Sequence, residues 1–173
     1  FFFSYMKSVI LNVPTYYGYD PIFKNKHKEY ASKSSHEKQD IIMSMYNHYK
    51  KYFNCIDNNG MTLLMYVSLF YRNNTVEFFV LVQLCSCFEV CDSKGMTPLM
   101  IAAANTNTTS HILAVKTLLL FSNINATDYQ GNNALIISFK SLDNSSSCHE
   151  TVELLERYCD KNYKNNEGKS FID

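Results

Sequence analysis

The side chains best suited to chemistry in this sequence are its thiols and imidazoles. Cys85, Cys87 and Cys91 form its cysteine cluster. Their C-x-C-x3-C spacing differs from the paired C-x2-C elements of structural zinc sites, and no histidine lies nearby in the sequence. Free, buried thiols are therefore expected, and no metal ion or other cofactor is predicted.

Cys148 and His149 are the second pair to consider, because a thiolate nucleophile needs a neighbouring base. Both lie in the predicted first turn of a helix, where the helix N-terminus can favour a thiolate. Adjacent residues on a helix point in different directions, however, and no acid is spaced to orient the histidine. The sequence also has no P-loop, dinucleotide-binding glycine motif or H-E-x-x-H motif. No enzymatic activity is expected.

The composition indicates an ordered globular chain. Of 173 residues, 46% are hydrophobic and 18% are charged, and sixteen basic residues balance sixteen acidic ones. A net charge of zero argues against nucleic-acid binding by the whole chain. No apolar run approaches the roughly 18 residues of a membrane-spanning helix, so no membrane association is predicted. No secretory signal is recognised, so a cytoplasmic location is expected.

A repeat of 35 to 37 residues organises the sequence from residue 57 onward. Each unit opens with an acidic or amide residue and a glycine three places later: Asp57 and Gly60, Asp92 and Gly95, Asp128 and Gly131, Asn165 and Gly168. This pattern is typical of a tight turn, since Asp accepts backbone N–H bonds and Gly tolerates positive φ. The repeated turns therefore predict a stacked array of similar units.

Two helices are predicted after each complete turn. Short apolar stretches at 65–68, 100–103 and 136–139 indicate the first helices, and amphipathic stretches at 76–84, 112–120 and 151–158 indicate the second. Thr97 and Pro98 form a strong helix start, and Asn74 with Glu77 and Ser147 with Glu150 are spaced as capping boxes. Neither helix can bury its apolar stripe alone, so the units must stack.

Residues 92–103, DSKGMTPLMIAA, resemble the ankyrin repeat signature D-x-x-G-x-T-P-L-H-x-A-A, with Met100 in place of the usual histidine. The other repeats match less well, and polar linkers replace the usual G-H between their helices. The resemblance implies an all-α ankyrin-repeat solenoid of helix-turn-helix units with short hairpin turns. The expected divisions are an irregular segment at 1–35, a degenerate partial repeat at 36–56, repeats at 57–91, 92–127 and 128–164, and a partial repeat or cap at 165–173.

The resemblance also implies a non-catalytic protein–protein interaction module. Ankyrin arrays bind partners through a concave side formed by turn tips and first helices. The matching positions, predicted to bind a partner protein, are Asn58, Asn59, Met61, Phe70, Ser93, Lys94, Met96, Asn105, Tyr129, Gln130, Asn132 and Lys140. Met61, Met96 and Tyr129 are expected to form one exposed row, which favours an interface. The alternative for these three is burial against the neighbouring repeat.

A second function is suggested by the uneven charge. Residues 1–56 carry eight lysines and four acidic residues, whereas residues 57–173 carry eight basic and twelve acidic ones. Lysines and tyrosines in the segment 16–51 could contact phosphates and unpaired bases of RNA. The chain could then be an accessory subunit on a ribonucleoprotein or other large assembly. Abundant Lys, Asn and Tyr also indicate an AT-rich genome, such as that of a parasite or large DNA virus, which makes their abundance weak support for function.

Overall fold

The computed structural model describes residues 33, 34, 36–38, 40, 41, 43, 44, 47, 54, 56, 59–69, 78 and 82–173. The helices that it describes from end to end are α4 (Leu63–Leu69), α6 (Pro98–Ala104), α7 (Ile112–Leu118), α8 (Ala134–Asp143) and α9 (His149–Leu155). The predictions for 1–32, Asn58, Phe70 and the capping box at Asn74 lie outside these residues.

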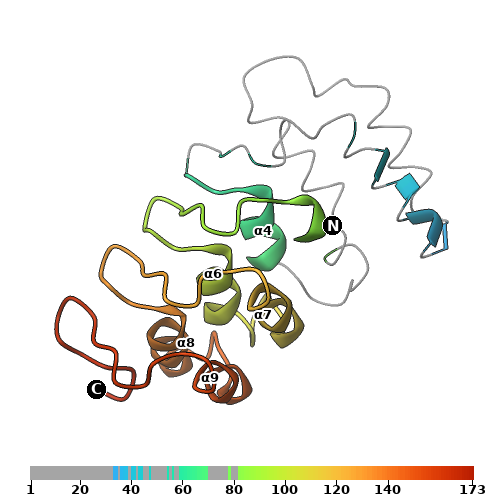
Figure 1. The fold of residues 1–173 in the computed structure, drawn as a ribbon. Helices are drawn as coiled ribbons and strands as arrows, with labels where there is room; N and C mark the ends of the chain where they lie inside the picture. The colour runs from blue at the N-terminus through green and yellow to red at the C-terminus, as the bar shows by residue number, and fades with distance from the viewer. Residues whose placement is uncertain are drawn as a thin grey trace.

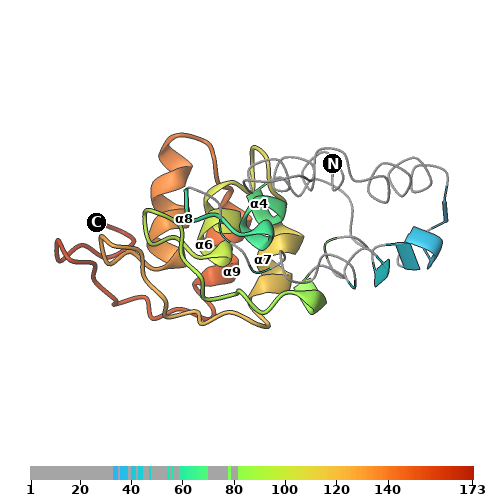
Figure 2. The same cartoon turned by 90° about the horizontal axis from the view of Figure 1, so that it is seen from above.

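The described helices form two rows, with hairpin turns projecting from one side. In Figure 1, α4, α6 and α8 follow one another in the row nearer the hairpins, and α7 and α9 lie in the row behind them. Figure 2 shows the last hairpins extending from the helices toward the same side. The described part of the chain contains helices, turns and one isolated bridge, Ile56 with Thr62, but no extended strand. The all-α solenoid is confirmed. None of the described helices is long and apolar enough to cross a membrane.

The first helices begin at capped residues that the repeat places in register. Thr97 caps α6, because its Oγ1 accepts from the Met100 N–H at 3.4 Å while its own N–H contacts the Met100 sulfur at 3.5 Å. Thr62 and Met65 make the same pair of contacts at 3.2 and 3.3 Å. The Met100 that departs from the ankyrin signature therefore still provides a weak acceptor at the start of the helix.

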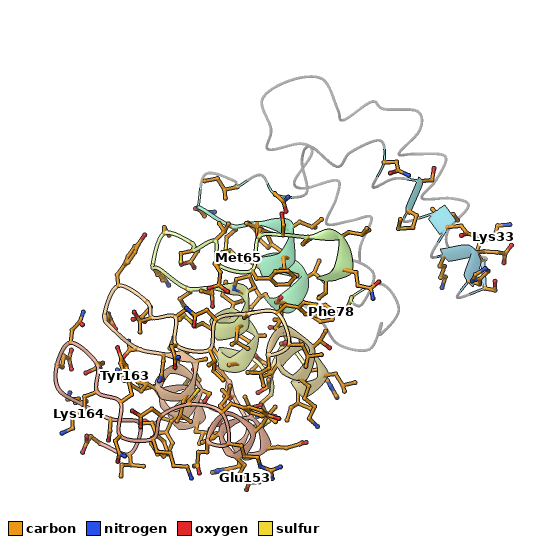
Figure 3. The ribbon with its side chains drawn as sticks, in the orientation of Figure 1. Lys33, Met65, Phe78, Glu153, Tyr163 and Lys164 are labelled. Atoms are coloured by element: carbon orange, nitrogen blue, oxygen red, sulfur yellow. The ribbon has the colours of Figure 1, made fainter. Side chains whose placement is uncertain are left out.

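The core is continuous from repeat to repeat. Helices α4, α6 and α8 pack in sequence, and α7 and α9 close the apolar side behind them. Leu64, Leu99 and Leu135 are at most 1% exposed and belong to the same cluster. Met65 and Phe78 are at most 2% exposed, whereas Glu153 is exposed and lies on the outer side of the stack in Figure 3. Each helix pair thus buries its apolar face only with its neighbours.

The long polar linkers between the paired helices bind one another across repeats. The Asn107 N–H donates to the Ser146 carbonyl at 3.0 Å, and its amide group donates to the Ser145 carbonyl at 2.9 Å. In the same contact between linkers, Thr106 Oγ1 lies 3.2 Å from Ser147 Oγ and accepts a hydrogen bond from Thr151 Oγ1 at 2.8 Å. These bonds replace the usual short connection with a polar contact between repeats.

One capping prediction is wrong in this region. Helix α9 begins at His149, and its cap residue is Cys148, which makes no side-chain capping bond. Ser147 is buried and instead donates to the Ala103 carbonyl of the preceding repeat at 2.8 Å. The inter-repeat bond therefore takes the hydroxyl that the capping box would have used.

The hairpins also form a hydrogen-bonded ladder. Three equivalent bonds join successive tips: Ser93 N–H to the Asn59 carbonyl at 3.0 Å, Tyr129 N–H to the Lys94 carbonyl at 3.2 Å, and Asn166 N–H to the Gln130 carbonyl at 3.1 Å. Each turn glycine has a positive φ, between 75° and 82°. A Cβ at Gly131 would lie 2.8 Å from the Asn166 backbone nitrogen, so the absent side chain permits the close approach.

Two glycine variants test this ladder. Gly168→Ala should cost about 1–2 kcal/mol of unfolding free energy, because its Cβ meets nothing within 4 Å and only the left-handed backbone is strained. Gly131→Ala should cost a further ~1–3 kcal/mol, because the next hairpin backbone must move. Urea denaturation of both variants measures the difference. Equal losses would contradict the close stacking of the hairpins.

Candidate functional site

The hairpin tips are held by side chains at the first position of each turn. Asp92 Oδ1 accepts from the N–H groups of Lys94 and Met96, both at 2.8 Å. Asp128 and Asn165 bind their own turns at the same relative positions, at 2.8–3.0 Å. The carbonyl of each of these residues also accepts from the turn glycine. The acidic or amide residue thus fixes the tip and leaves the next two side chains outside it.

Tyr129 is the large apolar side chain that these tips present. It is 71% exposed, although its backbone is bound on both sides. Its N–H donates to the Lys94 carbonyl, and its carbonyl accepts from the Asn166 amide group at 3.3 Å. The ring stands over Gly95, where a Cβ would lie 2.7 Å from Tyr129 Cδ1. The tyrosine is therefore both exposed and held in place by the adjacent hairpins.

Other predicted tip residues are exposed beside it. Asn59, Ser93, Lys94 and Gln130 are exposed, as is Lys140 on α8. Lys94 and Gln130 are directly connected to Tyr129, the first through the ladder bond and the second as its neighbour. We give the name hairpin-tip surface to Lys140 and the exposed residues of the described tips. These tip residues are Asn59, Ser93, Lys94, Tyr129 and Gln130 and, on the last hairpin, Asn166, Glu167 and Lys169. Tyr163 and Lys164 lead into its last hairpin and lie on the hairpin side in Figure 3.

Asn132 is buried, which corrects its prediction as a residue in direct contact with a partner. Its side chain is 3% exposed and joins three parts of the site. Its Oδ1 accepts from Lys140 Nζ at 3.0 Å and from Asn165 Nδ2 at 2.8 Å. Its own Nδ2 donates to Asp128 at 2.9 Å and to Gln130 at 3.2 Å. Asn132 therefore positions Lys140 and the next hairpin instead of meeting a partner.

The expected exposed row of Met61, Met96 and Tyr129 is also not found. Met61 and Met96 are half-buried, and Met96 packs against the hydrophobic core. The reason is register: both methionines follow a turn glycine, whereas Tyr129 precedes one by two positions. The backbone N–H at the methionine position binds inward to the turn carboxylate, which brings its side chain toward the helices.

Asn105 has a structural role at the end of α6. It is half-buried, and its amide group donates to the Ile101 carbonyl at 2.8 Å. Its carbonyl accepts from the N–H groups of Thr108 and Ser110, at 3.1 and 2.9 Å. These bonds hold the start of the long linker, so they explain the asparagine without a partner.

The fourth hairpin adds exposed residues that sequence reasoning missed. Asn166, Glu167 and Lys169 are exposed, and Asn166 occupies the same repeat position as Ser93 and Tyr129. Lys169 Nζ lies 3.0 Å from Glu167 Oε2. The hydrogen bond and charge of Lys169, with a smaller effect from Lys140, lower the pKa of Glu167. The repeat spacing of the Asn165 turn was the signal that could have identified them.

No thiol–imidazole hydrogen bond is found among the described cysteines and histidines. Cys85 and Cys87 are buried neighbours; a hydrogen bond from the Cys85 thiol lowers the pKa of Cys87 to about 7, and the same bond, with burial, raises that of Cys85. Burial raises the pKa of Cys159 to about 11. The Cys148 sulfur lies 3.2 Å from Thr151 Oγ1, whereas His149 is exposed. No group of three metal-ligating side chains occurs among the described residues.

The comparison with protein families agrees with the arrangement of hairpins and helices. A model described as ankyrin repeats (3 copies) matches residues 29–128 and 71–165. Together the two matches extend over most of the 173 residues. The search of curated proteins returned no match.

Asn132→Ala tests the link between the third and fourth hairpins. It should lower the unfolding free energy by about 1–3 kcal/mol, because the buried Asn165 amide and Lys140 lose their shared acceptor. Ser93→Ala, at an exposed tip position, is the control and should change stability by less than about 0.5 kcal/mol. Urea denaturation gives both values. Unchanged stability in Asn132→Ala would show that this network does not hold the last hairpin.

Proposed function

We propose, because the chain belongs to the ankyrin-repeat family, that it is a protein-binding module acting through the hairpin-tip surface. Ankyrin repeats are generally protein-interaction modules, and the fold leaves the tips outside the packed core. On this proposal the partner is a protein, and the module performs no catalytic step of its own.

The observation that carries the proposal is the exposed, fixed ring of Tyr129. Tyrosine is enriched at protein interfaces, because it supplies a large contact area with few rotatable bonds. The ladder bond and the Gly95 surface restrict its position before any partner arrives. Less conformational entropy is then lost on binding, which favours affinity. Gln130 and Ser93 provide polar contacts at the same tips.

Tyr129→Ala should weaken partner binding by about 2 kcal/mol or more, since aromatic anchors carry much of an interface's energy. Its effect on stability should stay below about 0.5 kcal/mol, because the side chain is exposed. Affinity capture from the native source, followed by mass spectrometry, identifies partners held by the unaltered chain and lost by the variant. Isothermal titration with the identified partner then measures the loss.

Tyr158→Ala is the matched control, because Tyr158 is a 62% exposed tyrosine that follows α9 and is not part of the hairpin-tip surface. It should retain the partner. Met96→Ala should mainly lower stability, because Met96 packs against the core. Partner binding that survives Tyr129→Ala would contradict the proposal. Loss of the partner only on removing residues 16–51, with salt-dependent retention on RNA, would favour the accessory-subunit alternative.

A further inference from the structure

We infer that the partner presents an acidic segment to the hairpin-tip surface, with carboxylates meeting Lys94 and Lys140 beside Tyr129. This inference rests on the proposed function and names the chemistry of its partner. It follows from which charges at the tips are already bound within the chain and which are available.

In the two turns that open with a described aspartate, the acidic side chain faces into its own hairpin. Asp92 and Asp128 are half-buried, and the Oδ1 atom of each accepts two backbone N–H groups. Asp128 Oδ2 also accepts from Asn132 at 2.9 Å. These bonds hold the two carboxylates inside their own turns, so they are less exposed to a partner than the side chains at the tips.

The lysines have the opposite arrangement. Lys94 is exposed, and no ion pair joins it to a described acidic residue. Lys140 is exposed and donates to a neutral acceptor, Asn132 Oδ1. No ion pair within 4 Å joins it to a described acidic residue, although its charge contributes to the lowered pKa of Glu167. Lys169 is paired with Glu167. Among the exposed charged side chains of the hairpin-tip surface, Lys94, Lys140 and Lys169 outnumber Glu167, so the charges most accessible to a partner are mainly positive.

Both lysines are connected to the tyrosine. The Lys94 carbonyl accepts from the Tyr129 N–H, so their side chains leave adjacent hairpins at the same tip row. Lys140 is linked through Asn132 to Gln130, the residue after Tyr129. An aromatic anchor with unpaired cations on neighbouring positions suits a segment that combines an apolar residue with Asp or Glu. An extended segment is favoured, because Lys94 and Tyr129 lie on successive tips and Lys140 lies on the helix that follows the second of them.

Selection from a displayed library of random twelve-residue peptides against the full chain tests this inference. Enriched peptides should contain Asp or Glu near an apolar residue. Lys94→Glu and Lys140→Glu should each weaken the selected peptides by about tenfold or more, because attraction becomes repulsion. Lys94→Arg should retain binding. Affinity should also fall as sodium chloride rises from low to high concentration.

Lys116→Glu is the charge-reversal control. Lys116 is exposed on α7, in the second row of helices, and binds Glu150 at 3.4 Å. It should leave peptide affinity unchanged. Neutral or basic peptides that depend on Tyr129 but not on either lysine would overturn the acidic partner and leave the proposed function standing. A selection that yields no peptide dependent on Tyr129 would contradict the proposed function as well.

Discussion

The close approach of one hairpin to the next is the constraint on which the rest of this structure depends. At Gly95 and Gly131 the following hairpin lies where a Cβ would stand, and a positive φ turns the chain back toward the helices. Only this close approach brings the N–H of one tip within hydrogen-bonding distance of the carbonyl of the tip before it. Once the hairpins are in register, the first helices that follow them are in register too, and their apolar faces meet in one core.

The departures from the ankyrin signature leave this constraint intact and are accommodated elsewhere. Longer linkers would weaken a repeat that relied on a short connection between its helices. Here the linkers of successive repeats bind each other through Asn107 and Ser146 and through Thr106, Ser147 and Thr151. Polar residues that look like a loop composition therefore add contacts between repeats, although the hydroxyls of Thr109 and Ser110 in the same linker are buried without a hydrogen-bond partner.

The sequence predicted the stacked units well, because the turn glycines and helix starts act locally. The site was predicted less well, since exposure depends on neighbours that a linear pattern does not contain. Tyr129 and Met96 were placed in one row, although they occupy different positions relative to the turn glycine. Asn132 resembled an exposed tip residue until its contact with Asn165, 33 residues away, was known. Comparing equivalent repeat positions would have separated Tyr129 from the methionines.

Those positions also explain how one scaffold can acquire a particular partner. Lys94 and Gln130 each lie two residues after the first residue of their turn, Asp92 or Asp128. Their backbone is constrained because their carbonyls accept the ladder bonds. The residue directly after the first residue of the turn is Ser93, Tyr129 or Asn166. Its side chain is exposed, and its backbone N–H donates the ladder bond. Substitution there changes the surface without changing the backbone bonds. On the proposed function, a tyrosine at this position adds a contact for a partner at little cost in stability, which is the combination that a binding module needs.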